Sequence, residues 1–163
     1  MSTSVVWARE PIPAGPSVFL AGPTPRSEAV ASWRPEAVRA LDAAWTASHP
    51  LHLLVPENPG GLHATEYDDQ IEWEWAGLDR ATAILFWIPR DLRTLPGFTT
   101  NVEFGLMARS GRTVLGCPPD CPNPERNRYL IRLARRFGVP VLQTLAETVA
   151  ATVRIVAGDD FEP

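Results

Sequence analysis

The sequence has little that would bind a metal, cross a membrane or crosslink a secreted fold. Only two of its 163 residues are cysteine, Cys117 and Cys121, and none of its three histidines lies in a metal-ligand pattern with them. We therefore expect two free thiols in a reducing compartment and no metal site. No apolar run approaches the ~20 residues of a membrane span. Residues 1–6 also lack the basic and apolar regions of a secretion signal, so we expect a cytoplasmic protein with no membrane partner.

The sequence also lacks the signatures of nucleic-acid and common nucleotide binding. Its net charge of −4 argues against a nucleic-acid polymer as partner, because contact with phosphate backbones usually requires a basic surface. The first loop, Leu20–Arg26, contains neither the G-x-G-x-x-G pattern nor the P-loop pattern. Binding of dinucleotides or nucleoside triphosphates of those two classes is therefore not supported.

Proline, in contrast, is abundant, with 17 residues that gather in four clusters. Each cluster separates two stretches of apolar periodicity, as loops between secondary-structure elements do. No internal repeat or long linker divides the chain, and its length suits one core. We expect a single domain over residues 1–163, with residues 1–16 as an irregular N-terminal arm. The clusters span Pro11–Pro25, Pro56–Pro59, Pro89–Pro96 and Pro118–Pro124.

Short apolar runs alternate along the chain with segments of helical periodicity. The run Ala83–Ile88 is apolar throughout, as a strand covered on both faces should be. The alternation predicts an α/β fold, a doubly wound parallel sheet of five strands in the order 2-1-3-4-5, with the ligand at the carboxyl ends of the strands. We expect strands at residues 17–21, 51–55, 83–88, 113–115 and 139–142, and helices at residues 32–48, 67–79, 101–110, 125–137 and 145–157.

Glu74 is the first candidate for chemistry. In the helix expected over residues 67–79, Tyr67, Ile71, Trp75 and Leu78 follow helical spacing and predict the core stripe. Glu74 falls at the margin of that stripe, where a carboxylate is costly unless it is paired or used. A boundary acid that is bonded to an arginine or a backbone amide explains this position equally well.

Glu103 is the second candidate. The capping residues Thr99, Thr100 and Asn101 predict a helix start, so Glu103 falls in the first turn, where the helix dipole favours a carboxylate. Its spacing to the apolar residues of the next turn also places it at the border of the core. Two acids near one edge of the sheet are suited to act as a nucleophile and an acid/base pair. Large aromatics such as Trp75 either fill the core or stack on a base.

Four segments together resemble the nucleoside 2-deoxyribosyltransferase-like proteins. They read VFLAGP at Val18–Pro23, a helix with an acid at Ile71–Leu78, ILFWIP at Ile84–Pro89 and TTNVEFG at Thr99–Gly105. The resemblance covers roughly residues 17 to 145. It implies a flavodoxin-like fold and a homo-oligomer in which a neighbouring subunit completes the site. It also implies cleavage of an N-glycosidic bond through a covalent glycosyl–glutamate, with no cofactor.

The resemblance also assigns roles to individual residues. Glu103 matches the family's nucleophile, and Glu74 falls where the family has a carboxylate, usually aspartate, that contacts base or sugar. The transferases commonly carry an aspartate about six residues before the nucleophile, where this chain has Gly97. The implied partner is a nucleoside or nucleotide. Hydrolysis of nucleoside monophosphates and a non-catalytic domain that binds nucleotide or ADP-ribose are the alternatives. The remaining predicted substrate contacts are Gly22, Pro23, Thr24, Trp75, Thr99, Thr100 and Asn101.

Overall fold

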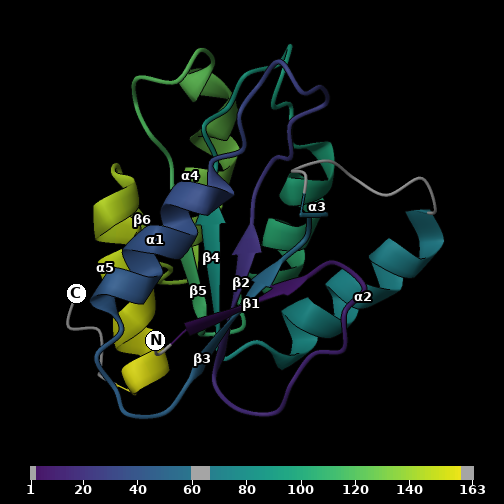
Figure 1. The fold of residues 1–163 in the computed structure, drawn as a ribbon. Coiled ribbons are helices and arrows are strands. Elements are labelled where there is room, and N and C mark those ends of the chain that lie inside the picture. The colour runs from purple at the N-terminus through teal and green to yellow at the C-terminus, as the bar shows by residue number, and fades with distance from the viewer. Residues whose placement is uncertain (1–2, 60–66, 159–163) are drawn as a thin grey trace.

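The fold is built on one parallel sheet of six strands in the order β1-β3-β2-β4-β5-β6 (Figure 1). The computed structural model describes residues 3–59 and 67–158 of the chain. The predicted α/β class is therefore confirmed, and five of the strands lie in the expected order. The strands are β1 (Thr3–Trp7), β2 (Ser17–Ala21), β3 (Leu51–Val55), β4 (Ala83–Trp87), β5 (Thr113–Gly116) and β6 (Val141–Leu142).

Strand β1 was not predicted. It makes the sheet six-stranded instead of five-stranded, and it lies in the segment that was expected to be an irregular arm before residue 17. It pairs in parallel with β3, and Thr3 lies beside Leu51 in the register. Only Val6 of its five residues is fully buried. An edge strand of this kind lacks the continuous apolar run by which the central strands were recognised.

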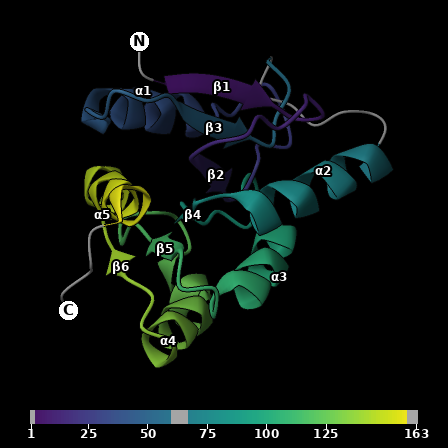
Figure 2. The same cartoon turned by 90° about the horizontal axis from the view of Figure 1, so that it is seen from below.

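The helices cover the two faces of the sheet unequally (Figure 2). Helices α2, α3 and α4 lie on one face, while α1 and α5 lie on the other, which gives three layers. None of the helices in the described part of the chain is long and apolar enough to cross a membrane. The helices are α1 (Arg34–Ala44), α2 (Tyr67–Arg80), α3 (Phe98–Met107), α4 (Arg128–Arg136) and α5 (Leu145–Ala157), with a 3-10 turn at Pro124–Asn127.

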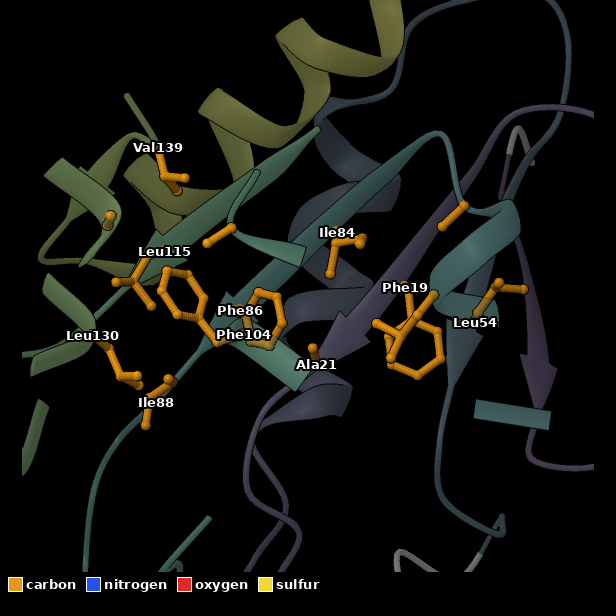
Figure 3. Close-up of a cluster of buried hydrophobic side chains, with 14 of the residues drawn as sticks. Phe19, Ala21, Leu54, Ile84, Phe86, Ile88, Phe104, Leu115, Leu130 and Val139 are labelled. Atoms are coloured by element: carbon orange, nitrogen blue, oxygen red, sulfur yellow. The ribbon is translucent and has the colours of Figure 1, made fainter. Parts of the chain in front are cut away.

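Alternate residues of the central strands fill two hydrophobic cores. Figure 3 shows the core beneath α2, α3 and α4, in which Phe86 of β4 meets Phe104 of α3 edge to face, with ring centroids 5.2 Å apart. Leu85 of β4 points into the opposite core, under α1 and α5. Since Phe104 is completely buried, its packing anchors the helix that carries Glu103.

The chain reverses its winding direction between β2 and β4, which are neighbours in the sheet. Open α/β sheets bind ligands in the crevice at such a switch point, outside the carboxyl ends of the strands. Gly22 directly follows β2 at this position with φ +150°. A Cβ there would lie 2.2 Å from the Trp87 carbonyl oxygen and 2.7 Å from Trp33. Only glycine therefore lets the loop leave β2 this close to β4.

Candidate functional site

A cavity of about 240 Å³ opens at this switch point, and both candidate glutamates line it. Its walls come from the loop after β2, the helices α1 and α2, and the start of α3. The predicted residues Gly22, Pro23, Thr24, Thr99 and Thr100 line the cavity together with Glu74 and Glu103. Segments that are distant in the sequence thus meet in one concave site, as a binding site requires.

The start of α3 differs from the prediction and changes the account of Glu103. The helix begins at Phe98, not near Asn101, and Gly97 precedes it in the left-handed conformation with φ +63°. Glu103 therefore lies in the second turn, where the helix dipole favours a carboxylate less than in the first. The half-buried side chain faces the cavity, so the dipole does not account for its position.

Helix α2 is rotated relative to the predicted core stripe. Trp75 is 55% exposed and does not line the cavity, whereas Trp73 is buried and packs on Phe19. The predicted place of Trp75 in the core stripe is therefore wrong, and its contact with substrate stays a prediction. Glu74 is 8% exposed and lies on the buried face of the helix rather than at its margin.

Gln70 holds Glu74 in place from the preceding turn of α2. Its amide Nε2 donates to Glu74 Oε1 at 2.9 Å and to the Pro56 carbonyl oxygen at 3.1 Å. Pro56 follows β3 and also lines the cavity. The contact fixes the Glu74 carboxyl group relative to the edge of the sheet, as preorganised sites require.

Arg34 is the buried cation of the cavity, and no motif in the sequence identifies it. It is 1% exposed, forms an ion pair with the equally buried Glu57, and also lines the cavity. Its Nε donates to the Leu20 carbonyl oxygen at 2.9 Å and its Nη2 to that of Gly22 at 2.7 Å. Arg34 therefore fixes the end of β2 and the loop that follows.

Burial raises the pKa of both glutamates, and the charge of Glu74 raises that of Glu103 further. The pKa of Glu103 rises to about 8, first because its carboxyl group is desolvated and second because of the nearby charge of Glu74. Burial also raises the pKa of Glu74, against the hydrogen bond from Gln70. The charge of Arg34 opposes both shifts. At neutral pH Glu103 therefore retains its proton beside the charge of Glu74, as expected for two carboxyl groups that share a site.

Arg90, in the loop after β4, is the second buried arginine that the sequence analysis missed. Its Nη1 donates to the carbonyl oxygens of Pro96 and, at 3.2 Å, of Gly97, while its Nη2 donates to Asn101 Oδ1 at 2.7 Å. Its Nε donates to Asn127 Oδ1 at 2.9 Å. The guanidinium group thus holds the turn from which α3 starts, and so positions Glu103.

Asn101 has a different place from the one predicted. Its side-chain oxygen accepts from Arg90 and the residue does not line the cavity, so the structure gives it a role in this turn, while its contact with substrate stays a prediction. Arg26, in contrast, lines the cavity as an exposed cation. Half of the hydrogen-bond partners of the Arg34 and Arg90 guanidinium groups are backbone carbonyl oxygens, which no sequence motif reveals.

Comparison with known proteins agrees with this geometry. Residues 15–121 match the family described as nucleoside 2-deoxyribosyltransferase like. The matched segment begins just before β2 and contains every residue named above as lining the cavity. A search of curated proteins gave no match.

Proposed function

This chain belongs to the nucleoside 2-deoxyribosyltransferase-like family, and we propose that it cleaves the N-glycosidic bond of a nucleoside or nucleotide with Glu103 as nucleophile. One observation carries the proposal. Two carboxyl groups, Glu103 and Glu74, line one small cavity at the switch point of the sheet, and Glu103 retains a proton at neutral pH beside the charge of Glu74. Glycosyl transfer requires this combination of one carboxylate and one carboxylic acid.

The reaction follows from the charge that develops in the substrate. The Glu103 carboxylate attacks the anomeric carbon while the carbon–nitrogen bond breaks, and the electron pair of that bond leaves with the base. Glu74 donates the shared proton to the departing base, which requires that the proton lie on Glu74 when substrate is bound. An acceptor base or water then attacks the anomeric carbon, releases Glu103 and returns a proton to Glu74.

The rest of the cavity supplies binding groups without a cofactor. The hydroxyl groups of Thr24, Thr99 and Thr100 are suited to hydrogen bonds with a sugar. Thr24 is held in place by Arg34 Nη1, which donates to its Oγ1 at 3.0 Å. Arg26 is the observation that favours a nucleoside monophosphate as substrate, because an exposed guanidinium at the rim matches a phosphate group. With water as acceptor, that substrate makes the enzyme a hydrolase.

The roles of the two glutamates can be distinguished by how the activity of each variant depends on the leaving group of the substrate. Release of free base from a panel of nucleosides and their monophosphates is followed by chromatography. Glu103→Gln should abolish release from every substrate, because no nucleophile remains. Glu74→Gln should lower release of natural bases by about 10²–10⁴-fold, the usual contribution of general acid catalysis. The same variant should cleave a deoxyriboside with a stable phenolate leaving group as fast as the wild type, because that leaving group needs no proton.

The matched control is Glu72→Gln, an exposed acid on the same helix that does not line the cavity, and it should leave activity unchanged. Full activity in Glu103→Gln would exclude the proposed nucleophile. Binding of a nucleotide without base release from any substrate would instead support the non-catalytic alternative.

We further propose that the protein is a homo-oligomer. Phe98, Val102 and Leu106 form a stripe along α3 and are 66%, 63% and 62% exposed. Gly105 lies beside this stripe, and a Cβ there would meet nothing within 4 Å, so a second helix could approach closely. Val102→Asp should dissociate the oligomer in light scattering, while Thr3→Asp on the edge strand should not. A wild-type monomer at micromolar concentration would contradict the proposal.

A further inference from the structure

A second cavity, of about 360 Å³, lies on the other side of Arg34 from the candidate active site. It opens between α1 and the strands β1 and β3, on the face of the sheet that carries α1. Most of its lining is apolar and includes Val5, Trp7, Pro35, Val38 and Val55. Its volume lies in the range of small-molecule sites.

The polar residues of this cavity are Ser32, Arg34 and Glu57, and the acceptor among them is the buried Glu57 carboxylate. Glu57 is 1% exposed, and its Oε1 accepts from Ser32 Oγ at 2.8 Å and from Arg34 Nη1. Its Oε2 accepts no hydrogen bond from the described residues. No fully buried polar side-chain atom among those residues lacks a partner, so Oε2 keeps some accessible surface, and Glu57 lines the cavity. An open acceptor in an apolar wall favours a ligand that donates to it.

We propose that this cavity is a second ligand site, which takes a flat, neutral, largely apolar molecule with a single N–H or O–H donor directed at Glu57 Oε2. Arg34 already balances the charge of Glu57, so an added cation would be uncompensated, whereas a neutral donor satisfies the open lone pair. The apolar walls at Trp7 and Val38 take the rest of the molecule.

Arg34 connects this site to the candidate active site. It lines both cavities, and its charge lowers the pKa of Glu74 and Glu103. A donor on Glu57 Oε2 draws electron density from the carboxylate and weakens its hold on Arg34. The field of Arg34 on the two glutamates then grows stronger. This coupling, unlike binding itself, rests on the proposed function.

Indole and indene provide a matched pair of probes, since they have nearly the same shape and only indole carries an N–H. Titration of the wild-type chain is followed by amide NMR. Indole should bind saturably and shift the signals of Val5, Trp7 and Val38, and indene should bind at least tenfold more weakly. Equal affinity of the two probes, no saturable binding, or shifts confined to Gly22 and Thr100 would each overturn the proposal.

Two substitutions on α1 test the location without disturbing the Arg34–Glu57 pair. Val38→Trp fills the cavity and should abolish indole binding. Arg39→Trp adds the same side chain at the next, exposed position, which does not line the cavity, and should leave binding intact. Retained binding in Val38→Trp, with an unchanged fold by circular dichroism, would overturn the assignment.

Saturating indole should also shift the pH at which the rate of base release declines on the alkaline side. This decline should move to lower pH, because a stronger field from Arg34 lowers the pKa of Glu103. An unchanged limb in the presence of bound indole would overturn the coupling. A wild-type chain that binds indole but releases no base would overturn the proposed function and leave the second site standing.

Discussion

Arg34 and Arg90 are both almost fully buried beside the same cavity, yet they act on it in different ways. Arg34 pairs with the carboxylate of Glu57, and its charge reaches both glutamates. Arg90 has no carboxylate partner among the described residues, and burial lowers its pKa. All its bonds go to neutral oxygens, three of them around the start of α3 and one on Asn127, just before α4. Arg34 therefore sets the charge of the site, and Arg90 sets its geometry.

Arg34→Met should have the largest effect, because it leaves Glu57 charged and buried without its partner. We expect a loss of about 3–5 kcal/mol in the free energy of unfolding, measured by urea denaturation. Adding Glu57→Gln should restore part of that loss. Arg39→Met on the same helix is the exposed control. A loss no larger than in the control would contradict the role of the ion pair.

The same variant tests the field of Arg34. The proposed acid step needs the proton that Glu74 and Glu103 share. Base release should therefore fall as pH rises through about 8, the pKa of Glu103, where this proton is lost. Arg34 lowers that pKa, so its removal should move the decline to higher pH. Activity that instead rises to a plateau above pH 8 would show that Glu103 must only lose its proton, and that Glu74 is not the acid.

Arg90→Met should lower the free energy of unfolding less than Arg34→Met does, but it should displace Glu103 more. It leaves the carbonyl oxygens of Pro96 and Gly97 without their donor, which should lower the free energy of unfolding by about 2–3 kcal/mol. A displaced Glu103 should lower kcat by about 10²-fold, measured well below the unfolding temperature. The pH dependence should not move, because the charge of Arg90 is not among the causes of the Glu103 shift.

Arg93→Met, in the same loop but exposed, is the matched control and should be neutral. Arg90→Lys should recover only part of kcat, since an ammonium cannot reproduce the planar fork of donors. A shifted pH profile in Arg90→Met would show that Arg90 acts through its charge, and the contrast with Arg34 would fail.

The contrast between the arginines also shows what the sequence can predict. The central strands were recognisable because runs such as Ala83–Ile88 are apolar on both faces, and parallel alternation then placed Glu74 and Glu103 near one edge. The start of α3 was not recognisable, because it is determined by a left-handed glycine whose carbonyl oxygen accepts from Arg90, rather than by a capping side chain. The face of α2 was misjudged because Trp75 is large and apolar but exposed.

Glu103→Gln should stabilise the protein in a pH-dependent way. The carboxyl group has a pKa of about 8 in the folded chain and about 4.3 when unfolded. Between these values the folded state holds a proton that the unfolded state has released, so wild-type stability falls as pH rises from about 4.3 to 8. The amide removes this loss. Linkage over about 3.7 pKa units sets an upper bound of about 5 kcal/mol at pH 8. Because solvent partly screens the half-buried carboxylate, the variant should gain about 2 kcal/mol at pH 8 and little at pH 4.5.

Urea denaturation at both pH values measures the gain, with Glu72→Gln as the exposed control that should show none. An equal gain at pH 4.5 and pH 8 would indicate better packing rather than relief of a buried charge. Adding Arg34→Met should enlarge the gain at pH 8, because the carboxylate that is removed would then lack its compensating cation.

Gly97→Ala should have the smallest effect and tests the fit between Gly97 and Arg90. Its φ of +63° strains any L residue, and its new Cβ would lie 2.9 Å from Arg90 Nη1. Gly138 is a matched control, since its φ is +69° and a Cβ there meets nothing within 4 Å. Gly138→Ala should therefore cost about 1 kcal/mol from backbone strain alone, whereas Gly97→Ala should cost more. The excess should disappear in the Arg90→Met background, where no guanidinium opposes the methyl group. Equal costs at the two glycines would mean that Arg90 moves aside freely and does not fix the start of α3.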